Sequence, residues 1–180
     1  MDAGAQRKRI TIAGILLGLG LGGFFDGIVL HQILQWHHML TSTGDHPATT
    51  VAGLEINTLW DGFFHLSTYI MMIAGLFMLT RVLSNRDRAV PWSTMAFIGL
   101  LLMGWGAFNV VEGLVDHHLL GIHHVRTGAN QRLWDVGFLI WGAAMFAGGW
   151  FLKQRNSQTK HMMGYTSARN RTHGDPRERT

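Results

Sequence analysis

Two short polar stretches stand out in an otherwise apolar sequence, and both combine carboxylates with histidines. The first is DGIVLHQILQWHH, at residues 26–38, and the second is EGLVDHHLLGIHH, at residues 112–124. Because the sequence has no cysteine, a metal site in this chain would use imidazole and carboxylate ligands, or methionine. Mixed imidazole and carboxylate sets suit iron, zinc or manganese, and imidazole-rich sets with a methionine such as Met39 also suit copper.

The two stretches align with each other without a gap. The shared positions pair Asp26 with Glu112, Gly27 with Gly113, Val29 with Val115, His31 with His117, Leu34 with Leu120, His37 with His123, and His38 with His124. The motif LWD at residues 59–61 recurs at residues 133–135. The pattern predicts a duplicated helical hairpin, with repeat 1 at about 10–82 and repeat 2 at about 94–152.

The segments that carry these residues are predicted to cross a membrane. The composition is 47% hydrophobic and only 14% charged, with a positive mean hydropathy. A helix needs about 20 residues to cross a bilayer, and four apolar stretches are long enough: roughly 10–36, 54–82, 94–119 and 132–152. We therefore expect an all-α membrane protein that forms an up-down bundle of four helices. Its glycines should let the first and third helices pack closely, at positions 14, 18, 20, 22, 23, 99, 104 and 106.

The basic residues flank the apolar stretches, which indicates membrane topology rather than nucleic-acid binding. They are Arg7, Lys8 and Arg9, then Arg81, Arg86 and Arg88, and finally Lys153, Arg155 and Lys160. The positive-inside rule then predicts that both termini are cytoplasmic, so that the loops at 38–53 and 120–131 face outside. We expect three parts: a basic terminus at residues 1–9, the membrane domain at 10–152 and a basic disordered tail at 153–180. Both repeats begin inside, so a two-fold axis along the membrane normal would relate them as parallel repeats.

Up-down packing would bring four carboxylates to a similar depth in the outer half of the membrane. Ionised groups cost roughly 2.5–3.5 kcal/mol each there, and they would repel one another unless protons or a cation intervened. A metal ion would supply that cation. The candidate ligands are Asp26, His31, Asp61, His65, Glu112, His117 and Asp135, with His37, His38, Asp116, His118, His123 and His124 as secondary candidates.

Helical spacing supports one pair of candidates and complicates another. Asp61 and His65 are four residues apart and share a helix face. Asp26 and His31 are five apart, about 140° around an ideal helix, so they need a kink or bulge to face one centre. The glycine that follows each acid is where such an irregularity could occur. Alternatively, the acids bind one ion in the core, and His31, His37 and His38 bind a second ion at a more exposed position.

Purely structural interpretations also exist for these side chains. A membrane-buried acid such as Asp135 can hydrogen-bond a neighbouring helix, and the histidine pairs at helix ends can cap backbone carbonyls. We expect no metal role for the histidines in the loop and tail, which are His46, His161 and His173.

The residues alone favour an integral membrane metalloprotein with a mono- or dinuclear iron, zinc or copper centre. Such a centre could serve an oxidoreductase or a metal-dependent hydrolase, with Glu112 as general base to a metal-bound water. A second hypothesis is a metal-handling or assembly protein that binds copper or another ion through His31, His37, His38 and their counterparts in the second stretch and passes it outward. A third is a haem protein with axial histidines. The partners expected are the lipid bilayer and, for a homo-oligomer, further copies of the chain, but no nucleic acid.

At GFFDGIVLHQILQWHH, LWDGFFH and EGLVDHHLLGIHH the chain resembles a bacterial family of four-helix membrane proteins known only as a domain of unknown function (DUF2243). The resemblance covers about residues 10–152. It implies a multi-pass protein of the bacterial inner membrane and brings no established activity. Family members are often encoded near a membrane assembly factor for haem-copper oxidases. The resemblance therefore implies copper handling, or a role beside respiratory-oxidase assembly proteins, as an alternative function.

Overall fold

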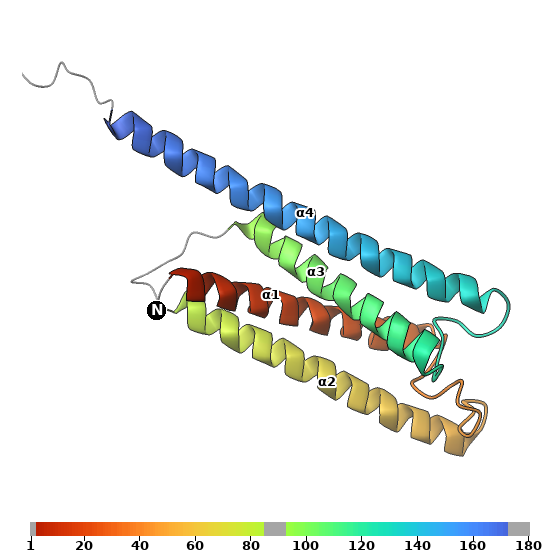
Figure 1. The fold of residues 1–180 in the computed structure, drawn as a ribbon. Helices are drawn as coiled ribbons and strands as arrows, with labels where there is room; N and C mark the ends of the chain where they lie inside the picture. Colours follow the sequence, from red (N-terminus) through yellow and green to blue (C-terminus); the bar gives the residue numbers. More distant parts are fainter. Residues whose placement is uncertain (1–2, 85–92, 173–180) are drawn as a thin grey trace, which may run out of the picture.

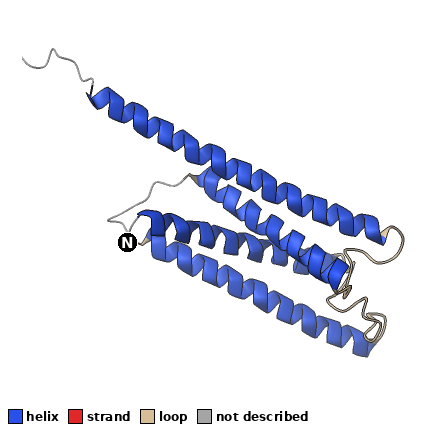
Figure 2. Cartoon of the chain, viewed as in Figure 1, coloured by secondary structure: helices blue, strands red, loops and turns tan. Residues whose placement is uncertain are grey.

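In the computed structural model the chain is all-helical (Figure 2), and no strand occurs among the residues that the structure describes. These are the backbone of residues 3–84 and 93–172 and the side chains of residues 4–84 and 93–156. The long helices are α1 (Ala3–Phe25), α2 (Val51–Leu83), α3 (Thr94–Glu112) and α4 (Gln131–Thr172). Short π-helical segments extend two of them, η1 (Asp26–Ile33) after α1 and η3 (Gly113–Leu119) after α3. The predicted fold class is therefore confirmed.

Four helical stretches are long and apolar enough to cross a membrane: Gly4–Ile33, Val51–Leu83, Thr94–Leu119 and Gln131–Asn156. The helix α1 packs against α2 and α3, and α3 packs against α4, so the order across the structure is α2, α1, α3, α4 (Figure 1). Neighbours along the chain run in opposite directions, so α1 and α3 point the same way. The loops at 34–50 and 120–130 therefore lie at one end of the bundle, which we call the loop end.

Glycines allow the two central helices to touch along their backbones. A Cβ atom on Gly18 would lie 2.8 Å from the Cα of Gly104 and would collide with the backbone oxygen of Leu101. The predicted close packing of these helices is confirmed here and at Gly14 and Gly22, which also face α3. Gly23 lies between Thr68 of α2 and Phe108 of α3. The prediction was wrong for three glycines that pack against the outer helices instead, namely Gly20 against α2 and Gly99 and Gly106 against α4.

We expect Gly18→Ala to destabilise the protein by about 1–3 kcal/mol, because its Cβ would meet backbone atoms that cannot move without separating α1 from α3. A matched control is Gly62→Ala on α2, where an added Cβ meets nothing within 4 Å. There the better helix propensity of alanine should leave stability unchanged or raise it by up to about 1 kcal/mol. Unfolding of both variants in mild detergent measures the difference, and equal stabilities would contradict this packing.

The helix α4 extends beyond its apolar stretch. The sequence predicted a disordered tail from residue 153, whereas the structure continues the helix to Thr172. Residues 153–172 contain no proline and a single glycine, and their lysine, arginine, glutamine and methionine residues favour continuation of a helix that has already begun. The disordered tail stays a prediction, and residues 173–180 lie outside the described part. At the other terminus α1 begins at Ala3, inside the segment predicted as a basic terminus.

The π-helical segments are the irregularity that the spacing of Asp26 and His31 required. In a π-helix the backbone hydrogen bond joins residues i and i+5, so residues five apart lie on the same side. Here the backbone N–H of Leu34 donates to the oxygen of Val29 at 2.8 Å, and an equivalent bond closes η3. Such segments are rare and occur frequently at functional sites. The kink or bulge predicted near the two acids is therefore confirmed.

Candidate metal centre

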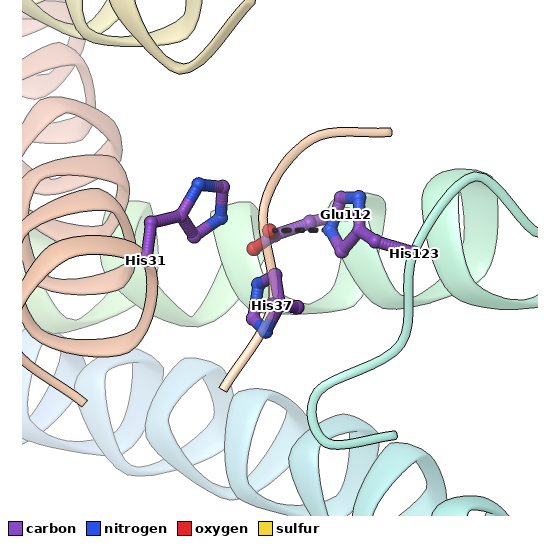
Figure 3. Close-up of side chains that lie close together, drawn as sticks. All are labelled: His31, His37, Glu112 and His123. Atoms are coloured by element: carbon purple, nitrogen blue, oxygen red, sulfur yellow. Dashed lines mark ion pairs between the residues drawn. The ribbon is translucent and has the colours of Figure 1, made fainter. Parts of the chain in front are cut away.

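Four buried side chains converge at the loop end of the bundle (Figure 3). They are His31 of η1, Glu112 at the end of α3, and His37 and His123 from the two loops. One ligand atom from each lies within 4.8 Å of the others. The histidines are at most 1% exposed and Glu112 is 4% exposed. We call these four residues the core cluster; three imidazoles and a carboxylate at this spacing fit the donor set of a transition-metal ion.

The atoms that face the centre of the core cluster have no hydrogen-bond partner among the described residues. They are the Nε2 atoms of His31, His37 and His123 and both carboxylate oxygens of Glu112. Buried polar groups are nearly always hydrogen-bonded, because an unsatisfied group costs about 1–3 kcal/mol, and more when it is charged. A shared metal ion would satisfy all five atoms at once.

Asp26 lies at the edge of the core cluster. Its Oδ2 atom is 2.9 Å from Nε2 of His31, and its Oδ1 atom is 3.9 Å from Nε2 of His37. The closer contact has the distance of an ion pair without the geometry of a hydrogen bond, since both atoms remain without a hydrogen-bond partner. The π-helical turn of η1 thus brings Oδ2 of Asp26 next to Nε2 of His31 at the edge of the core cluster, and neither atom has a hydrogen-bond partner among the described residues.

Each loop orients the histidine of the other loop. The Nδ1 atom of His37 is 2.9 Å from the backbone oxygen of Val125, and that of His123 is 3.3 Å from the backbone oxygen of Met39. A carbonyl oxygen can only accept, so Nδ1 carries the hydrogen in both rings and Nε2 presents a lone pair to the centre. The two rings stack with centroids 4.7 Å apart and planes 4° apart. This is the tautomer in which a histidine binds a metal through Nε2.

A left-handed residue turns each loop back towards the centre. Gln35 has a φ of 49°, and Gly121, its equivalent in the alignment of the two stretches, has a φ of 60°. Each is the second residue after its π-helical segment and reverses the chain before the histidine pair. The reversal sends His37 and His123 into the core cluster rather than out along the helix axis.

Asp61 lies behind His31, on the side away from the centre. Its Oδ1 atom accepts from Nδ1 of His31 at 2.8 Å and from the backbone N–H of Met39 at 3.0 Å, and its Oδ2 atom accepts from Nδ1 of His38 at 2.6 Å. A carboxylate that holds Nδ1 leaves Nε2 for a metal, an arrangement common in metal sites. These contacts give Asp61 the geometry of a residue that positions His31.

Asp135 makes the equivalent contacts in the second half of the chain. It accepts from Nδ1 of His124 at 2.8 Å and from the backbone N–H of Val125 at 3.0 Å. The third contact is looser, because Nδ1 of His117 lies 3.6 Å away. His117 is 4% exposed and neighbours His123, with ring centroids 5.0 Å apart.

The remaining predicted ligands lie outside these contacts. The Nδ1 of His65 donates to the backbone oxygen of Asp61, and that of His118 donates to the backbone oxygen of Gly113. Asp116 is partly exposed on η3. The structure thus gathers Asp26, His31 and Glu112 with two secondary candidates from the loops, and it sets Asp61, His117 and Asp135 next to them. The two backbone carbonyls that orient the loop histidines could not be predicted from residue types.

Burial lowers the pKa of His37 to about 4 and that of His123 well below its usual value, because a charged imidazole there would lose its hydration. Both rings are therefore neutral at neutral pH, as metal binding requires. In the metal-free protein the unfolded chain takes up these protons below about pH 6.5, whereas His37 in the folded protein does so only near pH 4. Stability should therefore fall as pH falls from about 6.5 to about 4, by about 3 kcal/mol for His37 alone.

Unfolding of the metal-free protein across this pH range measures the effect. His37→Gln removes the titrating ring and should make the dependence shallower. A stability that stays constant over the range, or a variant with the same slope as the wild type, would contradict the burial of a neutral His37.

Comparison with known proteins places the chain in a family. No curated protein and no solved structure gave a match. A family model described as a predicted membrane protein (DUF2243) matches residues 13–156, which include the whole core cluster. The resemblance drawn from the sequence motifs is confirmed over most of the chain. The chain therefore belongs to the DUF2243 family of predicted membrane proteins.

Proposed function

We propose that the protein is a membrane metalloprotein whose core cluster binds a transition-metal ion. The observation that carries the proposal is the convergence, within 4.8 Å, of three imidazole nitrogens and a carboxylate that have no hydrogen-bond partner among the described residues. The nitrogen and oxygen donors suit iron, zinc, manganese or copper. Glu112 belongs to this donor set, so we assign it a ligand role rather than that of a general base.

We infer that the two hairpins are copies related by a two-fold axis between α1 and α3. Support comes from contacts that recur at equivalent positions: the meeting of Gly18 with Gly104, the bonds of His37 to Val125 and of His123 to Met39, and the bonds of Asp61 to His38 and of Asp135 to His124. A residue near such an axis meets its own counterpart, which accounts for the stacked pair of His37 and His123. Each half would thus bring similar ligands to one centre.

We infer that the loop end faces the outside of a bacterial inner membrane and that both termini are cytoplasmic. The support is the position of the basic residues near the opposite end of the helices, at Arg7, Lys8, Arg9, Arg81, Lys153 and Arg155. Two arginines used for this prediction, Arg86 and Arg88, lie outside the described residues, as does the side chain of Lys160. The loops carry little charge beyond Asp45 and Arg126, as expected of segments that were translocated.

A resident metal fits the site better than a metal that is passed to another protein. His37 and His123 are 1% and 0% exposed, and each is held by the backbone of the other loop. Release would therefore require both loops to open. Copper handling for a respiratory oxidase remains the second candidate, supported by the expectation drawn from the family resemblance. It predicts rapid removal of the metal by a chelator, whereas a resident metal should leave slowly.

The packing of the histidines disfavours haem. The ring centroids of His31 and His37 are 4.4 Å apart, and those of His37 and His123 are 4.7 Å apart, which leaves no space for a macrocycle between them. We therefore expect an absorption spectrum without a Soret band.

Of the two reaction classes expected for a metal centre, redox chemistry is favoured over hydrolysis, because electrons and small molecules can reach a buried centre more easily than a larger substrate.

Elemental analysis of the full-length protein purified in detergent tests this proposal. At least about one equivalent of a transition metal per chain is expected. Less than about half an equivalent of any such metal, after growth under several metal supplies, would contradict it.

A further inference from the structure

His117 is a buried polar side chain that the core cluster leaves unused. It is 4% exposed, yet neither of its ring nitrogens has a hydrogen-bond partner among the described residues. Its Nδ1 lies 3.6 Å from Oδ1 of Asp135, whereas Nδ1 of its counterpart His31 is hydrogen-bonded to Asp61 at 2.8 Å. A neutral imidazole always has one donor and one acceptor nitrogen, so an imidazole without hydrogen-bond partners leaves both unsatisfied. The burial of His117 therefore needs an explanation beyond packing.

The ligand atoms around His117 form the second of two similar groups. In the first hairpin, Asp26 lies 2.9 Å from Nε2 of His31 and 3.9 Å from Nε2 of His37. In the second, Glu112 lies 3.5 Å from Nε2 of His123, and His117 is packed against that ring. Each hairpin thus supplies one carboxylate and two histidines. Every one of these six side chains has at least one buried atom without a hydrogen-bond partner, and for Asp26 this atom is Oδ2.

Four carboxylates lie in or beside the centre, and their four negative charges in the ionised state match two divalent cations: Asp26, Glu112, Asp61 and Asp135. Asp26 contacts His31 and Glu112 contacts His123, and the centroids of these two rings are 5.8 Å apart, so both acids lie in the same buried region. Two ionised carboxylates in a medium of low dielectric repel each other. No lysine or arginine side chain takes part in the cluster's ion pairs among the described residues. Two divalent ions shared by these carboxylates would remove the repulsion and use both acids.

We propose that the centre is dinuclear, with a second metal ion bound by His117 and with the carboxylates of Asp26 and Glu112 shared between the two ions. This inference rests on the proposed function, because it adds an ion to the same centre. In known two-metal sites the ions lie about 3.5–4 Å apart. The second position would lie beside the core cluster, where the rings of His117 and His123 have centroids 5.0 Å apart. Each ion would receive two imidazoles from one hairpin and carboxylate oxygens from both.

Titration of the metal-free, full-length protein with Co²⁺, followed by its d–d absorption, tests the second position. The wild type should bind about two equivalents, and His117→Ala should lose about half of this uptake. The matched control is His118→Ala, the next residue, whose side chain is exposed and bonded to its own helix. It should still bind two equivalents. A wild type that saturates at one equivalent, with no change in His117→Ala, overturns the proposal.

A measurement on the wild type alone covers the case in which His117→Ala fails to fold. X-ray absorption of the Co²⁺-loaded protein should show scattering from a second metal at about 3.5–4 Å. One bound ion without this scattering overturns the dinuclear centre and leaves the proposed function standing. A wild type that takes up no Co²⁺ and contains no transition metal when purified overturns both.

Discussion

Replacement of Asp61 by alanine is expected to lower metal affinity about 10- to 100-fold and to destabilise the metal-free protein by about 3–5 kcal/mol. The variant removes the acceptor of three hydrogen bonds, those from the rings of His31 and His38 and from the backbone of Met39. Without Asp61, His31 loses the group that holds Nε2 towards the centre. The loop at 34–50 also loses its attachment to α2. Competition titration with a metal chelator measures the affinity, and unfolding in detergent measures the stability.

Asp45→Ala is the matched control, because it removes an exposed carboxylate from the same loop. Its effect on stability should stay within about 0.5 kcal/mol, and its metal affinity should equal that of the wild type. Asp61→Asn keeps one acceptor oxygen and should fall between the two. If Asp61→Ala and Asp45→Ala behaved alike, Asp61 would not be the residue that positions His31.

Joint replacement of His37 and His123 by alanine is expected to reduce the metal content of the purified protein at least tenfold. The two rings supply two of the four ligand atoms of the core cluster. They come from separate loops, so the double variant removes one ligand from each hairpin. Elemental analysis of the variant beside the wild type measures the loss.

A suitable control for the double variant is His46→Ala, a histidine in the same loop that lies outside the core cluster. It should retain the metal content of the wild type. A double variant that keeps its metal would show that the ion lies elsewhere in the chain. Size-exclusion chromatography of both proteins establishes that any loss of metal is not a loss of fold.

The fold could be predicted largely from local features of the sequence. Hydropathy over stretches of about 20 residues depends only on composition, so the four membrane-crossing stretches were recognisable without knowledge of their packing. The π-helical segments were also indicated, since Asp26 and His31 are both polar in an apolar helix and lie five residues apart. The extension of α4 to Thr172 was not predicted, because a polar and basic composition is typical of disorder as well as of an exposed helix.

The roles within the candidate site were harder to predict, because they depend on the paths of the loops. His37 and His38 are adjacent in the sequence, but the first enters the core cluster and the second binds Asp61. The backbone carbonyls of Val125 and Met39 that orient the loop histidines carry no signal in residue type. Asp61 was expected as a ligand from its helical spacing to His65, whereas its side chain turns towards His31 and His38. A side chain that binds a metal and one that positions a ligand can be of the same residue type. Only their three-dimensional contacts distinguish the two roles.

We propose the core cluster as the place where this protein binds metal. An anomalous-difference map recorded at the absorption edge of the bound metal, from crystals of the full-length protein, tests this assignment. We expect density at the loop end of the bundle, about 2.0–2.2 Å from the Nε2 atoms and carboxylate oxygens that bind it, with His31, His37, Glu112 and His123 among the ligands. Density confined to other histidines, or a map with no peak in protein that retains stoichiometric metal, would contradict it.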